Sequence, residues 1–279
     1  MSTPHGHQHH GHHHGDWSAM AETLDLDALL LEGHFGNIFD WIASQSADPR
    51  TIVDLGAGTG TGTFGLARTY PGASIVAVDQ SESMLELLAE KAQDRALGGR
   101  VSTIHADLDQ QWPELGGVDL MWAATSMHHF ANPLEVFAHI RDSLSPDGIL
   151  VVVEMEAFPR YLPADLGFGN PGFEERCHRA TEPEDFNPHP DWTRELEASG
   201  YAAVLHRTFD YCESSDQELL ARAARLSLSR LREHLPDGFP AQDLATLEEL
   251  LDPDSSRSVG HRTDLVMRGS HNVWVARVR

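Results

Sequence analysis

The chain has little cysteine and no long apolar run, and each shortage excludes a class of protein. No stretch approaches the roughly 18 unbroken apolar residues that a membrane helix requires. The two cysteines, Cys177 and Cys212, belong to a chain of 279 residues whose N-terminus is polar and unlike an export signal, so we expect reduced thiols. These absences predict a cytoplasmic protein without a membrane partner.

Positive charge is also scarce. The 20 Lys and Arg residues are outnumbered by 43 Asp and Glu residues, which gives a net charge of −23. A surface of this sign repels the phosphate backbone that a nucleic-acid-binding protein must neutralise, so DNA and RNA are not expected as partners. With 41% hydrophobic residues, the chain can bury one main core and a small appended lobe.

The first 15 residues lack apolar periodicity and are rich in histidine. We expect a disordered tail over residues 1–15. Such a density of imidazoles suits Ni, Cu, Zn or Co ions, which makes a metal-buffering or lid role our hypothesis. A purification tag is the alternative, although the interspersed Gly and Gln favour a native tail. The histidines of the tail are His5, His7, His9, His10, His12, His13 and His14.

The next part of the chain changes from helical to alternating patterns. Residues 16–46 have apolar positions at helical spacing, with Gly33 and Gly36 as interruptions between two helices, and predict an N-terminal helical lid. Residues 47–156 alternate apolar strands with helices, which indicates a parallel sheet covered on both faces. The expected strands are 51–55, 74–79, 101–106, 118–124 and 149–153, and the expected helices 63–70, 82–97 and 134–144.

The second half is less regular. Residues 157–190 are rich in Pro, Gly and aromatic residues and predict a loop that covers the substrate rather than a core element. Residues 191–279 resume the alternation. They contain a helix at 192–199, a strand at 201–209, a helical region at 215–251 broken at 236–238, and a closing strand at 272–278.

A glycine-rich loop follows the first expected strand, at the sheet edge where parallel α/β folds bind ligands. It consists of Gly56, Ala57, Gly58, Thr59 and Gly60. Alternate glycines allow close approach of the backbone to a ligand, and the helix that follows offers free N–H groups. A dinucleotide loop needs a third glycine where Thr61 stands, and the carboxylate of Asp54 would repel a pyrophosphate. A cationic sulfonium ligand with an α-amino group is therefore favoured.

Acidic residues also follow the next two expected strands. Asp79 ends the second strand, where a carboxylate takes the two ribose hydroxyls of a nucleoside. Asp107 and Leu108 follow the third strand, where an acceptor for an adenine amine belongs. Gln80 and Met84 are placed to flank the ring, and Ala124 at the end of the fourth strand completes the expected cofactor site.

The order of these motifs resembles the class I methyltransferase family, over residues 17–148 and more loosely through the final strand. The resemblance implies S-adenosyl-L-methionine as cofactor and S-adenosyl-L-homocysteine as product, with no metal required. Asp54 to Gly60 would hold the methionine part, Asp79 the ribose, and Asp107 with Leu108 the adenine. It also implies a doubly wound, Rossmann-like α/β fold with seven strands, the last antiparallel, and a helical insertion before the last strand.

The acceptor side is expected after the fourth and fifth strands. His128 and His129 are similar to a histidine pair found there in many small-molecule methyltransferases, and the N-P-P-aromatic or D-P-P-aromatic run of members that methylate amides or adenine is lacking. Either histidine can serve as general base for a hydroxyl, or the pair can be structural. Glu154 either contacts substrate or is a solvated strand end.

The predicted function is methyl transfer to oxygen, nitrogen or carbon of a small molecule. Aromatic side chains are the first candidates for the walls of its pocket, although packing roles are open for most. They are Trp17, Phe35, Phe39, Trp41, Tyr161 and Phe173. Two alternatives remain. One is an NAD-type oxidoreductase, against which the loop spacing and Asp54 argue, and the other a noncatalytic metal- or cofactor-sensing module that uses the His-rich tail.

Overall fold

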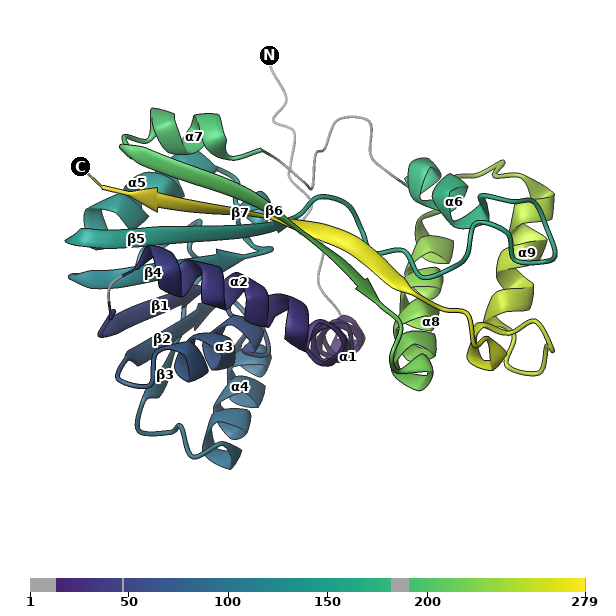
Figure 1. Ribbon diagram of the computed structural model, residues 1–279, viewed down its shortest axis with the longest axis horizontal. Coiled ribbons are helices and arrows are strands. Elements are labelled where there is room, and N and C mark those ends of the chain that lie inside the picture. Colours follow the sequence, from purple (N-terminus) through teal and green to yellow (C-terminus); the bar gives the residue numbers. More distant parts are fainter. Residues whose placement is uncertain (1–13, 47, 182–190, 279) are drawn as a thin grey trace, which may run out of the picture.

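A seven-stranded sheet organises the molecule, with strand order β3-β2-β1-β4-β5-β7-β6 (Figure 1). The computed structural model describes residues 14–46, 48–181 and 191–278, with side chains from residue 20 onward. The strands β1 to β5 pair in parallel, and β7 is antiparallel to both of its neighbours. The prediction of a doubly wound α/β sheet with an antiparallel last strand is confirmed. The strands are β1 Thr51–Leu55, β2 Ser74–Asp79, β3 Val101–His105, β4 Val118–Ala124, β5 Leu144–Met155, β6 Ala203–Glu213 and β7 Met267–Arg277.

Helices cover both faces because the central strands are apolar on both sides. Ile52, Leu120 and Val151 point to one face, which α2 (Glu32–Gln45), α3 (Thr61–Thr69) and α4 (Glu82–Asp94) cover. Val53, Met121 and Val152 point to the other face, which α5 (Pro133–Ser143) and α7 (Thr193–Ala198) cover. Ser81 is the N-cap of α4, since its hydroxyl accepts a hydrogen bond from the Met84 N–H at 3.3 Å.

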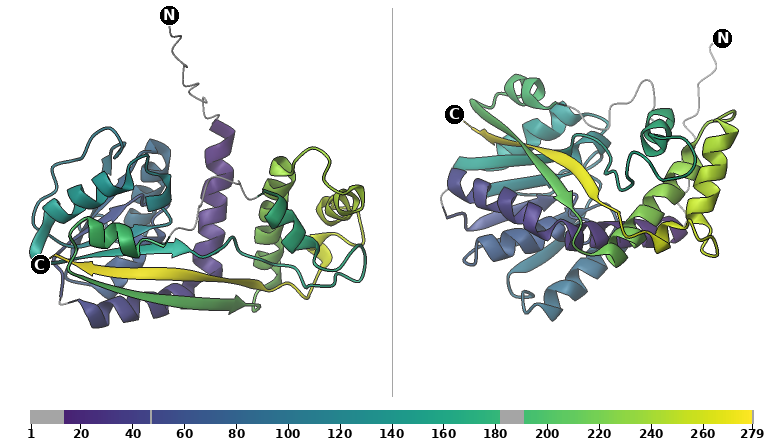
Figure 2. Two further views of the ribbon diagram at one scale, coloured as in Figure 1. Left: turned by 90° about the horizontal axis from the view of Figure 1, so that it is seen from above. Right: turned by 45° about the vertical axis from the view of Figure 1, so that its right-hand side comes forward.

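A second, helical lobe stands beside the sheet and has its own apolar core. It contains α6 (Phe173–Thr181), α8 (Gln217–His234) and α9 (Ala241–Leu251). The strands β6 and β7 run past the sheet to carry this lobe (Figure 1). Helix α1 (His14–Leu30) lies between the sheet and α8, and packs on α8 (Figure 2). The carboxyl ends of the parallel strands therefore face α1 and the helical lobe.

Two details differ from the sequence predictions. Gly33 and Gly36 do not interrupt a helix, because both lie inside α2 and the break between α1 and α2 falls at Leu31. Residues 157–190 are not all irregular, because they contain α6, whose Phe173 and Cys177 are buried in the core of the lobe. Spaced at i and i+4, these two residues make a one-sided apolar stripe that the surrounding Pro and Gly obscure in the sequence. Residues 182–190 lie outside the described ranges.

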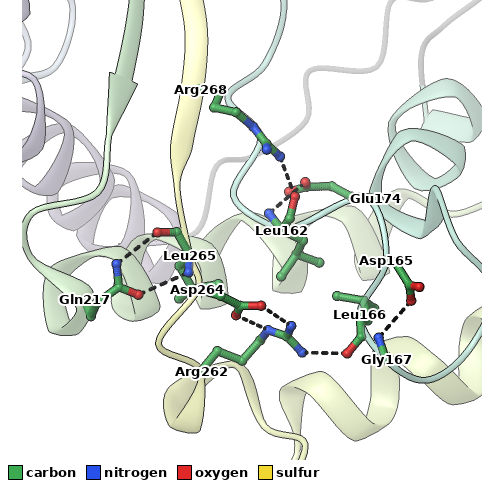
Figure 3. Close-up of polar contacts among 10 residues, drawn as sticks. All are labelled: Leu162, Asp165, Leu166, Gly167, Glu174, Gln217, Arg262, Asp264, Leu265 and Arg268. Carbon is green, nitrogen blue, oxygen red and sulfur yellow. Dashed lines mark hydrogen bonds and ion pairs between the residues drawn. The ribbon is translucent and has the colours of Figure 1, made fainter.

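Polar contacts bind the segment that enters the lobe to the segment that leaves it (Figure 3). The buried carboxylate of Glu174 accepts backbone N–H bonds from Tyr161 and Leu162 at 2.8 and 2.9 Å. Arg268 of β7 donates to the carbonyl of Leu162. Arg262 bonds both the carboxylate of Asp264 and a backbone carbonyl near the start of the lobe. The chain after β5 is therefore held in place where it passes the ends of the strands.

Within the described ranges, none of the helices is long and apolar enough to cross a membrane. Cys177 and Cys212 are free thiols, the first buried and the second exposed.

Candidate functional site

Loops after β1, β2 and β4 meet at one edge of the sheet. The parallel register sets Leu55 beside Val78 and Ala123, so the residues that follow these positions are neighbours. The glycine loop, Asp79 and the histidine pair come from these three loops. The structure thus brings together three features that are far apart in the sequence.

The glycine loop requires its glycines for two reasons. Gly56, Gly58 and Gly60 have φ angles of +68°, +51° and +97°, in the left-handed region that residues with a side chain rarely adopt. A Cβ atom at Gly56 would also lie 2.6 Å from Cβ of Ser126, the first residue of the turn before the histidine pair. Between these contacts the N–H groups of Gly56 and Ala57 donate to the carbonyl of Val78. The loop is a backbone cradle that packs against the turn after β4.

Asp79 joins the glycine loop to the start of α4. Its Oδ2 accepts a hydrogen bond from the Gly58 N–H and its Oδ1 one from the Ser81 N–H, both at 2.8 Å. The side chain is partly exposed, and each carboxylate oxygen has a further lone pair. Asp79 is therefore held in one orientation and can still accept hydrogen bonds from a ligand.

Asp54 is buried beneath the glycine loop. It is 2% exposed, and its Oδ2 accepts a 2.6 Å hydrogen bond from the Thr63 hydroxyl in α3. Burial raises the pKa of this carboxyl to about 7, against the opposing effect of the Thr63 bond. A Cβ at Gly62 would come within 3.0 Å of the same oxygen. This geometry favours support of the loop over the direct contact with a cation that the sequence suggests.

The expected adenine-binding residues follow β2 and β3, which pair Asp79 beside His105. The carboxylate of Asp107 accepts bonds from the Asp109 N–H at 3.1 Å and the Gln110 side chain at 2.5 Å. Leu108 is buried in the sheet core, and Met84 is buried at the start of α4. Gln80 is exposed, and its carbonyl contacts the His105 ring. These positions lie along one edge, and the oxygens of Asp107 already bind their own turn.

His128 and Glu154 form a hydrogen-bonded pair across the ends of β4 and β5. Nδ1 of His128 donates to Oε2 of Glu154 at 2.8 Å, because a carboxylate can only accept. Glu154 is 1% exposed, and its other oxygen accepts a 3.4 Å bond from the Trp192 indole N–H. This tautomer leaves Nε2 of His128 as an acceptor. Both residues were expected at the acceptor side, but their bond was not.

His129 lies against His128, with ring centroids 4.1 Å apart. Partial loss of solvent around the ring, with the nearby His128 and Arg230 acting in the same direction, lowers the pKa of His129 to about 4, so this ring is neutral at pH 7. Thr125, just before the turn, has a φ angle of +48°, which is strained for a residue with a branched side chain. The turn that presents the histidines is thus held in an unusual conformation by its surroundings.

The predicted aromatic wall is mostly packing. Phe39 stacks on Trp122, with ring centroids 5.1 Å apart. Trp41 packs on Phe209 of β6. Strand β6 is four strand positions, about 19 Å, away from β1 in the sheet. Phe35 is half-buried beside His271 at 5.3 Å. Tyr161 and Phe173 are buried in the core of the helical lobe. The side chain of Trp17 lies outside the described part.

Two charged residues near the site were not singled out from the sequence. The guanidinium of Arg230 in α8 lies 5.2 Å from the centroid of the Phe158 ring. Asp27 in α1 is half-buried near Tyr161 and Tyr211, and burial raises the pKa of its carboxyl to about 7. No local pattern marks either residue, because their neighbours belong to distant segments.

Metal ligands were expected only in the tail, and His5 to His13 lie outside the described ranges. Helix α1 begins at His14. Among the residues that the structure does describe, no three His, Cys, Asp or Glu side chains are grouped as a metal site would require.

Comparison with known proteins gives one family match and several relatives. Residues 52–148 match the model of a methyltransferase domain. The chain is 35% identical over 104 residues to a trans-aconitate 2-methyltransferase of Acidovorax sp. (strain JS42), covering 37% of this chain and 38% of that protein. It is 33% identical over 151 residues to a demethylmenaquinone methyltransferase of Thermus thermophilus, covering 52% and 66%. The matches therefore span from about a third to about two thirds of these relatives.

Solved structures share the fold at low sequence identity. The YcgJ protein of Bacillus subtilis has a TM-score of 0.53 at 15% identity, covering 89% of this chain and 99% of that one. Phosphoethanolamine N-methyltransferase 2 of Haemonchus contortus, solved with phosphomonomethylethanolamine and S-adenosylhomocysteine, has a TM-score of 0.52 at 15% identity, covering 95% and 60%. At these identities the likeness is one of fold.

Proposed function

Since the chain contains a class I S-adenosylmethionine-dependent methyltransferase domain, we propose that it transfers a methyl group from S-adenosylmethionine to a small molecule. The observation that carries the proposal is the bond from the Gly58 N–H to Asp79, which joins the glycine cradle to the carboxylate of the neighbouring strand. The names of the relatives, which act on trans-aconitate and demethylmenaquinone, support a small acceptor. The net charge of −23 argues against a nucleic acid.

The chain's own residues fit the cofactor. A Cβ at Gly58 would meet Leu24 of α1 at 3.1 Å, so α1 lies over the cradle on that side and forms its lid. Asp79 takes the ribose hydroxyls, and Asp107 with Leu108 the adenine. When bound, S-adenosylmethionine supplies an activated methyl group, so the protein needs chiefly to align the acceptor and exclude water.

His128 acts on the acceptor. Its Nε2 takes a proton from an acceptor hydroxyl or amine, while Glu154 holds the ring in the required tautomer. Trp192 positions Glu154 through the second carboxylate oxygen. His129, neutral beside it, supports the ring of His128 by contact. This arrangement suits an acceptor atom that loses a proton on methylation.

Mass spectrometry of the protein under native conditions tests the cofactor. We expect S-adenosylmethionine or S-adenosylhomocysteine to co-purify, or S-adenosylhomocysteine to bind on calorimetric titration. A matched titration with NAD serves as the control, because dinucleotide loops rely on similar glycines. Binding of NAD without binding of S-adenosylhomocysteine would refute the proposal.

A further inference from the structure

Arg230 brings a positive charge from the helical lobe to the acceptor side of the site. Its guanidinium lies 5.2 Å from the centroid of Phe158. Phe158 stands four residues after Glu154, a span of at most about 14 Å. The positive charge of Arg230 also reaches His129, since it helps to lower the pKa of that ring. Helix α8 therefore places a cation against Phe158, within electrostatic reach of His129.

Arg230 has no carboxylate partner among the described residues, and the same holds for Arg225 of α8, whereas two other arginines of this helix are paired. Arg222 pairs with Glu22 at 2.9 Å, and Arg232 pairs with Glu248 at 2.8 Å. Arg230 instead lies over the face of an aromatic ring, which orients a guanidinium and leaves the N–H groups on its edge free to donate. A planar guanidinium held in this way matches the two oxygens of a carboxylate.

A second polar group beside the same ring lacks a partner. His178 of α6 stacks on Phe158 with ring centroids 6.4 Å apart and an angle of 21° between the rings. The residue is 5% exposed, and its Nε2 is buried without a hydrogen-bond partner in the part of the chain that the structure describes. Burial and the charge of Arg160 lower the pKa of His178 to about 4. A buried nitrogen without a partner is costly, which points to a ligand atom beside Phe158.

We propose that the methyl acceptor is a carboxylic acid whose carboxylate binds Arg230, with His178 beside it and the atom to be methylated toward His128. This inference rests on the proposed methyl transfer and names the class of its acceptor. A carboxylate carries one negative charge, which one guanidinium and one neutral imidazole can satisfy. A phosphate dianion would require more donors.

Carboxylate binding can be measured before the acceptor is known. The protein loaded with S-adenosylhomocysteine is titrated at pH 7 with succinate and with benzoate, and the NMR signal of His129 Cε1–H reports binding. Succinamide and benzamide are the neutral matches, and His129→Gln assigns the signal. We expect at least one carboxylate to shift the signal saturably and neither amide to do so. The dissociation constant should rise about 10-fold or more in Arg230→Gln, the scale of a lost hydrogen bond to a charged group.

Arg232→Gln is the matched control, because it removes the same charge from the same helix at a residue paired with Glu248. It should behave as the wild type. Failure of both carboxylates to bind, an equal response in Arg230→Gln, or a response to inorganic phosphate alone would overturn the inference. Calorimetry with S-adenosylhomocysteine on the same variants separates the two proposals. If the wild-type protein does not bind S-adenosylhomocysteine, the proposed methyl transfer is contradicted. If it binds S-adenosylhomocysteine but neither carboxylate, only the carboxylate site is contradicted.

Discussion

At the residue scale, two carboxylates on neighbouring strands have different environments and different roles. Asp79 is partly exposed and held by two backbone N–H groups. Asp54 is buried and has a single hydroxyl donor. Burial without a charged partner disfavours the ionised form of Asp54. Asp79 is therefore the residue suited to bind a ligand, and Asp54 the one that supports the loop.

Asp79→Ala should weaken binding of S-adenosylhomocysteine. The loss removes hydrogen bonds to a charged acceptor, about 1.5 to 3 kcal/mol, or about 10- to 150-fold in the dissociation constant. Calorimetric titration measures it. Asp94→Ala, at the exposed end of α4, removes the same charge from a nearby segment and should leave affinity unchanged. Unchanged affinity in folded Asp79→Ala would show that the ribose site lies elsewhere.

Asp54→Asn should change how stability depends on pH. The pKa of Asp54 is about 7 in the folded state and 3.8 as the unperturbed value, so its contribution to stability is present below pH 3.8 and lost as pH rises through 7. Relative to Asp54→Asn, the free energy of unfolding of the wild type should fall by about 2 to 3 kcal/mol between pH 5 and pH 8. Urea denaturation at both pH values measures this. Exposed Asp40→Asn should show no such trend.

His128→Gln should lower kcat by about 10²- to 10⁴-fold, the contribution of a general base. Glu154→Gln should lower kcat less and change its pH profile, because Gln can still orient the ring but does not stabilise its charged form. Turnover is measured as release of S-adenosylhomocysteine with the acceptor found in a screen of small molecules. His129→Gln is the control and should retain most activity. A greater loss in His129→Gln than in His128→Gln would reverse the assignment.

At the scale of elements, α2 and α3 approach closely because of one glycine. A Cβ at Gly65 of α3 would lie 2.0 Å from the Phe39 ring of α2, which itself stacks on Trp122 of the sheet. Gly36, inside α2, has open space where a Cβ would be. Both glycines stand in helices, but only Gly65 is required by packing.

Substitution of these two glycines by alanine should have opposite effects on stability. Gly36→Ala should raise the free energy of unfolding by about 0.4 to 1 kcal/mol, because alanine restricts the unfolded chain and meets no atoms in the fold. Gly65→Ala should lower it by about 1 to 3 kcal/mol through overpacking. Denaturant titration of both variants measures the two changes in the free energy of unfolding. Equal effects at the two positions would contradict the packing of Phe39 against Gly65.

At the scale of the whole molecule, two cores are joined by the long β6 and β7 strands and by α1 (Figure 2). The excess of acidic residues affects the parts of the molecule around both cores. Because a net charge of −23 repels itself in a compact fold, ions that screen it should favour folding.

Salt should therefore stabilise the protein. We expect the melting temperature to rise between about 0.02 M and about 0.5 M NaCl, as the Debye length shortens from about 20 Å to a few ångströms. Sucrose at matched osmolality is the control for effects other than screening. A melting temperature that falls with NaCl would mean that the surface ion pairs outweigh the net repulsion.

The sequence by itself determined the doubly wound sheet, the antiparallel last strand and the place of the glycine loop. The sheet and the loop follow from local signals, since apolar strands, turn residues and alternate glycines act within a few residues of one another, whereas the antiparallel last strand was implied only by the family resemblance. It also marked Asp79, His128 and Glu154 as strand-end residues. Helix α6 was missed because its short apolar stripe lies among Pro and Gly.

Only the tertiary structure decided how those side chains are placed and which groups they contact. It turned Asp54 under the loop, bonded His128 to Glu154 and placed Arg230 over Phe158. It also stacked Phe39 on Trp122 and packed Trp41 against Phe209. The physical reason is that hydrogen bonds and burial depend on the direction of each side chain and on contacts between distant segments. No periodicity along the chain encodes either of these.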